Sequence, residues 1–328
     1  MSMKGNSDKS KIMFSVIIPA FNAEKFIKKA IYSVLGQSYD GFELIVVDDG
    51  SGDGTGDLVK NICDDRITYF RQTNQGVSVA RNTGIQLAKH DYICFLDSDD
   101  FWMHDHLETM KYLIEKYRNC RMYLTGYSVC LRDGRVVPKS EKLLKSINSN
   151  DFECGNAFLI RQKYGYFMHI NSICCHREVF SRLGYFEPGV RNGEDDDMWY
   201  RAFAYYSVAI SKKTTSVYTR TNCGATSRRK FYSDWVFIKR IPSIIDDPAV
   251  PQDRKDSLLQ IAELRKLSQV RSMISEGWKK KAFEMFRKLD IRRLPKKKWC
   301  ITLVSFLIPS GIISRLLSYR DKSYYANN

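Results

Sequence analysis

The sequence predicts an α/β protein with a mostly parallel central sheet flanked by helices, followed by a helical C-terminal extension. Three observations support this fold class. Apolar runs of strand length alternate with helical segments through the first hundred residues, as in parallel strands joined by crossover helices. Two of these runs end directly in acidic clusters. The 328 residues, 44% of them hydrophobic, are enough for a full core and exclude global disorder.

The first hundred residues supply four strands and the three helices between them. Residues 1–11 are polar and are expected to be disordered. We expect strands at 14–18, 43–47, 67–71 and 92–96, and helices at 23–36, 57–63 and 74–89. Pro19 is expected to end the first strand, and Asn22 to cap the first helix.

Acidic residues follow two of these strands. Asp48 and Asp49 precede a glycine-rich turn, and Asp97, Asp99 and Asp100 follow the strand at 92–96. Parallel strands place their carboxyl ends at one edge of a sheet, where ligands bind. Because crowded carboxylates repel one another, we expect a divalent cation there, Mg²⁺ or Mn²⁺, that carries the phosphates of a ligand. The alternative is a solvated turn that caps the next helix.

Other nucleotide-binding and metal-binding classes are disfavoured. The chain has no GxGxxG of a dinucleotide fold and no Walker lysine. Its nine cysteines form no zinc-type spacing, and their odd, scattered arrangement favours a reducing compartment.

Four motifs in order resemble those of family 2 glycosyltransferases, which have the GT-A fold. They are SVIIPAFN at 15–22, VVDDGSGDGT at 46–55, GVSVARNTGIQLA at 76–88 and YICFLDSDD at 92–100. The resemblance covers roughly residues 13–105 and is of the type that builds bacterial cell-surface polysaccharides. It implies a nucleotide-sugar donor, with a UDP-sugar favoured.

The resemblance also implies roles for individual residues. Asp49 would accept a hydrogen bond from the base, Arg81 would approach the diphosphate, and Asp97 with Asp99 would form the metal-binding DxD element, Asp99 being the favoured direct ligand. The donor-binding residues implied in this way are Pro19, Ala20, Phe21, Asn22, Asp49, Gly50, Ser51, Arg81, Asp97 and Ser98. Asp100 gains no role and is assigned at most to capping the next helix.

A later segment, LGYFEPGVRNGED at 183–195, resembles the acceptor-side motif of the same family. It implies that Asp195, paired with Glu194, is the general base that takes the proton from an acceptor hydroxyl. The alternative is that the acids at 194–197 complement the N-terminal dipole of the following helix, and the base assignment is open by one position. His169 is interpreted as a structural or acceptor-contacting residue.

The segment 218–227 resembles one that in this family carries a histidine near the diphosphate. Asn222 and Cys223 stand where that histidine is expected, so the sequence departs from the family pattern at this position. Arg220, Arg228 and Arg229 are alternative phosphate partners, or they form a solvated basic loop.

The net charge of +15 is concentrated near the C-terminus. Thirteen Lys or Arg residues lie between Lys279 and Lys322, against three acidic residues, and they flank an uncharged run at 299–314. That run is too short for a confident membrane span, so we expect an interfacial anchor on an anionic membrane. A helix packed on the core is the alternative. Nucleic-acid binding ranks low because no known module is present.

The expected protein is an inverting, metal-dependent glycosyltransferase on the inner face of the plasma membrane, acting on a glycan or lipid-linked glycan hydroxyl. Its expected division is a donor half at 12–105, an acceptor half at 106–230 and a basic extension at 231–328. One alternative is a polyprenyl-phosphate glycosyltransferase. The other is a non-catalytic membrane- or nucleic-acid-binding protein on a transferase scaffold.

Overall fold

The structure, a computed structural model, describes residues 11–139, 143, 145–146, 148–165, 167–190, 193–220 and 236–312. The chain forms two compact units. Unit 1 comprises residues 1–155, 166–190 and 206–222, and unit 2 comprises residues 156–165, 191–205 and 223–328. The expected division into donor half, acceptor half and extension is one of function and stays a prediction.

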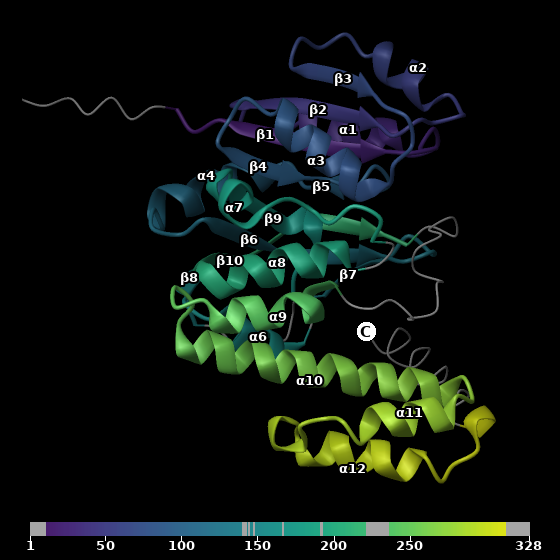
Figure 1. The fold of residues 1–328 in the computed structure, drawn as a ribbon. Helices are drawn as coiled ribbons and strands as arrows, with labels where there is room; N and C mark the ends of the chain where they lie inside the picture. The colour runs from purple at the N-terminus through teal and green to yellow at the C-terminus, as the bar shows by residue number, and fades with distance from the viewer. Residues whose placement is uncertain are drawn as a thin grey trace, which may run out of the picture. The chain divides into compact units, whose positions relative to one another are not determined.

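The strands of unit 1 are β1 (Phe14–Ala20), β2 (Phe42–Asp48), β3 (Ile67–Arg71), β4 (Tyr92–Phe95), β5 (Phe101–Trp102), β6 (Met122–Cys130), β7 (Val136–Pro138), β8 (Asp151–Cys154), β9 (Ile173–His176) and β10 (Val208–Thr219). The described residues form one ten-stranded sheet of order β3-β2-β1-β4-β9-β6-β10-β5, with β7 beside β6 and β8 beside β10 (Figure 1). The first four strands are mutually parallel, as are β6 and β10. β9 runs antiparallel between β4 and β6, so its beginning lies at the edge where β4 ends.

The helices of unit 1 are α1 (Ile27–Leu35), α2 (Thr55–Lys60), α3 (Val77–Leu87), α4 (His106–Lys116) and α7 (Glu178–Leu183), with the 3₁₀ turn η1 (Ile170–Ser172) before β9. Alternate β1 residues such as Val16 and Ile18 share a core cluster with α1 and α4. Ile17 faces α3 on the other side, where a Cβ at Gly84 would lie 2.3 Å from Ile17 Cγ2. Glycine thus lets α3 approach the sheet closely.

The sequence suggested that the first strand stops before Pro19, and this prediction is wrong. β1 continues to Ala20, and Pro19 pairs in register with Val47 of β2. The pairing with β4 extends only to Ile17, whose carbonyl accepts the Leu96 amide. Since strand residues alternate in direction, Pro19 directs its missing N–H toward the β4 side, beyond the last pair, where no ladder hydrogen bond is lost.

The first helix also begins later than expected, at Ile27, and Asn22 does not cap it. Asn22 adopts a left-handed conformation with φ 49°. Its side-chain oxygen accepts the Gly52 amide at 2.8 Å, so it joins two loops.

The helices of unit 2 are α6 (Ala157–Tyr164), α8 (Glu194–Tyr205), α9 (Val236–Asp246), α10 (Gln252–Ser275), α11 (Lys279–Phe286), the 3₁₀ turn η2 (Ile291–Arg293) and α12 (Lys296–Ser305). Phe158 packs on Tyr200 and Phe203 of α8, and Tyr200 packs on Phe237 of α9. The second half of α10 shares a separate core cluster with α11 and α12, which lie alongside it (Figure 1). α9 and α10 are separated by residues 247–251, which include Pro248 and Pro251.

The uncharged run at 299–314 folds in part as α12, which ends at Ser305, before Pro309. Within the part of the chain that the structure describes, no helix combines the length and apolarity needed to cross a bilayer.

His106 should make folding sensitive to acid. The ring is fully buried, stacks on Trp102 and lies 2.7 Å from Thr215 Oγ1. Burial lowers the pKa of His106 to about 3. The unfolded chain takes up this proton below pH ~6.5, whereas the folded protein does not until near pH 3, so stability is lost as pH falls through that window.

Between pH 7 and pH 5 the contribution is about 2 kcal/mol. His106→Asn, which has no titrating group, should therefore lose about 2 kcal/mol less than the wild type over this interval. Urea unfolding at both pH values measures the difference. Equal losses in the two proteins would contradict the assignment.

Candidate active site

The loops after β1 and β2 interlock at one edge of the sheet. The Asn22 amide donates to Ser51 Oγ at 3.0 Å, and the Asp49 amide donates to the Ala20 carbonyl at 2.8 Å. Gly50 has φ 78°, and a Cβ there would lie 2.9 Å from the Asn74 amide nitrogen. The turn thus requires glycine.

The predicted base-pocket residues lie where β1 ends. Pro19 and Ala20 are the last residues of β1 and are buried. Phe21 follows with 51% of its surface exposed, so it offers an open aromatic face beside the Asn22 turn. Their contact with a nucleotide base stays a prediction.

Asp49 is buried, and its carboxylate holds the start of α3. Its oxygens accept hydrogen bonds from Gln72 Nε2 at 2.8 Å, the Gln75 amide at 2.9 Å and the Gly76 amide at 2.7 Å. A carboxylate has about four acceptor positions, so these bonds leave room for a further donor.

Arg81 reaches from α3 to the end of β4. Its Nη2 lies 2.9 Å from Asp97 Oδ1, and the side chain is 4% exposed. The Phe186 ring lies 5.5 Å from the guanidinium carbon. Arg81 therefore supplies positive charge to the acidic loop, here defined as residues 97–100.

Asp100 is the buried member of the acidic loop. Its Oδ1 accepts the Thr219 amide at 2.6 Å, and its Oδ2 accepts Asn171 Nδ2 at 2.5 Å. Burial, together with the charges of Asp99 and Asp97, raises the pKa of the Asp100 carboxyl well above its usual value. Asp97, Ser98 and Asp99 are half-buried.

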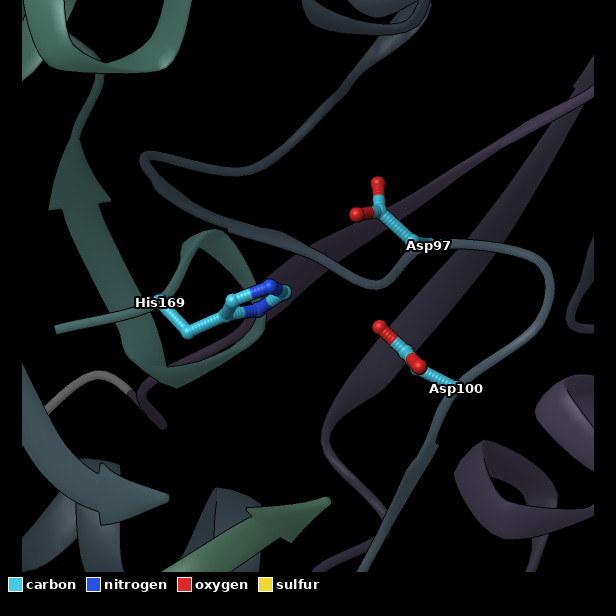
Figure 2. Close-up of side chains that lie close together, drawn as sticks. All are labelled: Asp97, Asp100 and His169. Carbon is cyan, nitrogen blue, oxygen red and sulfur yellow. The ribbon is translucent and has the colours of Figure 1, made fainter. Parts of the chain in front are cut away.

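His169 faces the acidic loop from the segment before β9 (Figure 2). One ligand atom each of Asp97, Asp100 and His169 lies within 4.8 Å of the others. The His169 ring packs between Tyr127 and Tyr218, at centroid distances of 5.5 and 4.8 Å. Burial lowers the pKa of His169 to about 4, so the ring is neutral at pH 7.

This group fits a divalent cation. Carboxylate oxygens are the preferred ligands of Mg²⁺ and Mn²⁺, and a neutral imidazole can also ligate a metal. Burial first, and then the negative charges of Asp99 and Asp97, raise the pKa of Asp100, and a cation would relieve the repulsion among these carboxylates. Asp99, the favoured ligand by resemblance, is outside the group of three, and its metal contact stays a prediction.

Asp100 and His169 were not identified as site residues from the sequence. Asp100 is part of the loop after β4, and His169 joins it because β9 runs antiparallel to β4, which brings residues 169–171 to the end of β4. Four consecutive polar residues after a buried strand were the available signal for Asp100. Nothing in the sequence indicates the direction of β9.

The four acids at the start of α8 lie in unit 2 and have different surroundings. Asp196 and Asp197 are buried. Asp196 pairs with Arg265, and Asp197 pairs with Arg201 and Arg240. Glu194 and Asp195 are half-buried, and Asp195 Oδ1 accepts the Asp196 amide at 2.8 Å.

The expected phosphate-approaching segment is described only up to Arg220. The Arg220 amide donates to the Cys130 carbonyl at 3.0 Å. Asn222, Cys223, Arg228 and Arg229 lie outside the described residues.

Comparison with known proteins identifies relatives and a shared fold. A protein of Bacillus subtilis named for teichuronic acid biosynthesis, the glycosyltransferase TuaG, is 39% identical over 145 residues, which are 43% of this chain and 57% of TuaG. The chain thus spans little more than half of that relative. A GalNAc(5)-diNAcBac-PP-undecaprenol beta-1,3-glucosyltransferase of Campylobacter jejuni is 24% identical over 93% of this chain and 97% of its own length.

Among solved structures, S. aureus TarS 1-349 in complex with UDP-GlcNAc superimposes with a TM-score of 0.61 at 21% identity, over 90% of this chain and 80% of that one. The predicted GT-A fold is confirmed by this likeness. The family described as Glycosyl transferase family 2 matches residues 15–234, about two thirds of the chain. The protein is therefore a member of glycosyl transferase family 2.

Proposed function

We propose that this protein is an inverting, metal-dependent glycosyltransferase that moves a sugar from a nucleotide-sugar, with a UDP-sugar favoured, to a hydroxyl of a lipid-linked or polysaccharide acceptor in surface polysaccharide synthesis. The observation that carries the proposal is the acidic loop at the end of β4, with Arg81 paired to Asp97 and the interlocked loops of β1 and β2 at the same edge.

The donor half of the proposal follows from charge. A nucleoside diphosphate brings negative charge to a loop that is already crowded with carboxylates, so a cation is needed between them. Asp97 and Asp99 by resemblance, with Asp100 and His169 by position, would hold Mn²⁺ or Mg²⁺, and a bound metal would stabilise the charge on the leaving diphosphate. The UDP-GlcNAc complex of TarS favours a UDP-linked donor.

Asp195 is the proposed general base, beside Glu194. The acceptor oxygen attacks the anomeric carbon, its proton passes to the Asp195 carboxylate, and the bond from that carbon to the diphosphate oxygen breaks. One carboxylate suffices for this single displacement, which inverts the anomeric configuration. The burial of Asp196 and Asp197 supports the half-buried pair Glu194 and Asp195 as the site of the base, because a base must be reached by the acceptor hydroxyl.

A lipid-linked acceptor is supported by the name of the C. jejuni relative, which specifies an undecaprenol-linked substrate. The alternative is transfer to a polyprenyl phosphate. A product analysis separates the two, because a sugar joined to a hydroxyl gives an ordinary glycosidic bond, whereas a sugar joined to a phosphate gives an acid-labile phosphodiester.

Features of unit 2 support an anionic membrane as a binding partner. On α12, Trp299 packs in the core cluster and Thr302 is buried, where its hydroxyl accepts Arg271 Nε at 2.6 Å. The opposite side exposes Ile301 and Val304, both at 53%, and Leu307, which follows the end of α12, is 84% exposed. A helix that is apolar on both sides needs a second apolar surface.

Exposed cations are frequent in the segment that precedes this apolar side. The exposed basic residues of 279–298 are Lys280, Lys281, Arg287, Lys288, Arg292, Lys296, Lys297 and Lys298. Basic side chains beside exposed aliphatic ones match the interface of a bilayer that contains anionic lipids. We place the enzyme on the inner face of the plasma membrane for this reason.

Asp99→Ala should reduce metal-dependent turnover of the donor to background, because the carboxylate proposed to bind the metal is gone. A panel of sugar nucleotides is incubated in Mn²⁺ and in EDTA, and release of the nucleoside diphosphate is measured. Asp57→Ala, which removes an exposed carboxylate of α2, is the control and should behave as wild type. Unchanged donor hydrolysis by Asp99→Ala in Mn²⁺ would exclude the metal role.

Asp195→Asn should lower the rate of transfer by at least about a hundredfold and leave donor affinity unchanged, since an amide cannot take the proton. Donor binding by calorimetry and transfer under saturating donor separate the two effects. Asp256→Asn, an exposed acid of α10, is the control. Full transfer activity in Asp195→Asn would assign the base to another residue.

The triple change Ile301→Ser, Val304→Ser and Leu307→Ser should weaken binding to vesicles of phosphatidylcholine and phosphatidylglycerol by at least about tenfold, because three apolar side chains no longer enter the interface. Cosedimentation measures the affinity. Val136→Ser with Leu159→Ser removes side chains of similar exposure, 51% and 54%, and should have no effect. Equal binding of the triple variant and wild type would contradict membrane docking by α12.

A further inference from the structure

The side chain of Asn171 touches the acidic loop at two points. Its Oδ1 accepts the backbone amide of Asp97 at 2.9 Å, and its Nδ2 donates to Asp100 Oδ2 at 2.5 Å. The Asn171 carbonyl also accepts Trp102 Nε1 at 2.8 Å. Asn171 is fully buried, and Asp100 is 1% exposed, so neither bond is shared with bulk water.

The chemistry of this contact is specific to an amide. The two ends of the loop offer a backbone N–H and a carboxylate, so one side chain that holds both needs an acceptor and a donor on the same carbon. Among side chains of this length, only asparagine has both. Aspartate would keep the acceptor but would place a fourth carboxylate beside Asp100. Leucine would fill the same space but would leave the Asp97 amide and the Asp100 carboxylate without these partners inside the protein.

Asp100 also bonds to a third segment of the chain. Its other oxygen accepts the Thr219 amide at the end of β10. The start of β9, the end of β4 and the end of β10 are thereby joined through two buried side chains. The backbone position of Asp97 then determines where its carboxylate meets Arg81 and faces His169.

From this geometry we propose that Asn171 is a positioning residue, which holds the acidic loop in the conformation that receives the metal and the diphosphate. The catalytic consequence of this proposal rests on the proposed function. The two hydrogen bonds from Asn171 to the loop do not depend on that function. Residues that orient metal ligands are typically worth about 10–100-fold in metal affinity or activity.

The primary test is hydrogen exchange, which needs neither metal nor donor. In Asn171→Ala, the backbone amides of residues 97–100 should exchange about tenfold faster than in wild type, while those of β1 should keep their protection. Asn156→Ala is the matched control. Asn156 is also buried, and it donates to the Asp253 carbonyl, Asp253 Oδ2 and Ser257 Oγ in unit 2.

The second measurement is Mn²⁺ affinity in the presence of UDP. Asn171→Ala should bind Mn²⁺ at least about tenfold more weakly, whereas Asn156→Ala should lower only the thermal midpoint. If the alanine variant does not fold, Asn171→Ser replaces it, because a hydroxyl can keep one of the two bonds and should give an intermediate increase in exchange.

Unchanged exchange at 97–100 in both Asn171 variants would overturn the proposal. Loop exchange that rises without any change in Mn²⁺ affinity would overturn its catalytic consequence. Wild-type protein that binds no Mn²⁺, with loop exchange still raised in the variant, would instead count against the proposed metal dependence and leave the hold of Asn171 on the loop intact.

Discussion

Electrostatic repulsion within the acidic loop is the constraint on which the site depends. Three carboxylates lie within four residues after a buried strand, and of these Asp100 is buried while Asp97 and Asp99 are only partly open to solvent. The protein offsets this repulsion with donors from distant segments: Arg81 from α3, Asn171 from η1 and the Thr219 amide from β10. Asn171 reaches the loop because β9 lies antiparallel beside β4, and Thr219 reaches it because β5, which follows the loop, pairs with β10.

The donor-side fold was largely predictable because its information is local. The apolar runs of β1, β2 and β4 are nearly continuous, as expected for strands buried on both faces, and the motifs that follow them are contiguous in sequence. Pro19 misled the prediction of β1, since its effect depends on whether a neighbouring strand lies on the side of the missing amide. That is a property of the sheet and not of the segment.

The second half of the sheet was less accessible to prediction. β10 was missed because its middle, Ser211–Thr215, is polar and interrupts the apolar pattern on both sides, with register shifts against β6 in this region. The role of Asp100 and the position of His169 depend on the antiparallel direction of β9, which no local pattern encodes. The motifs therefore predicted which segments end at this edge of the sheet, whereas the full set of their neighbours was not predictable.

The four acids of α8 are a second case in which the sequence predicts a cluster but not the surroundings of its members. In sequence they are equivalent members of one cluster, and the base could be assigned only by resemblance. In the structure, Arg265 from α10 and Arg240 from α9 pair with Asp196 and Asp197, and both arginines are distant in sequence. Burial distinguishes Asp196 and Asp197 from Glu194 and Asp195, which remain partly open to solvent.

We propose above all that the acidic loop binds a nucleoside diphosphate by way of a bound cation. Calorimetric titration of UDP into the full chain, in Mn²⁺ and in EDTA, tests it most directly. We predict that UDP binds at least about tenfold more tightly with Mn²⁺ than in EDTA, because the cation offsets the repulsion between the diphosphate and the carboxylates. Equal UDP affinity in Mn²⁺ and in EDTA would contradict it.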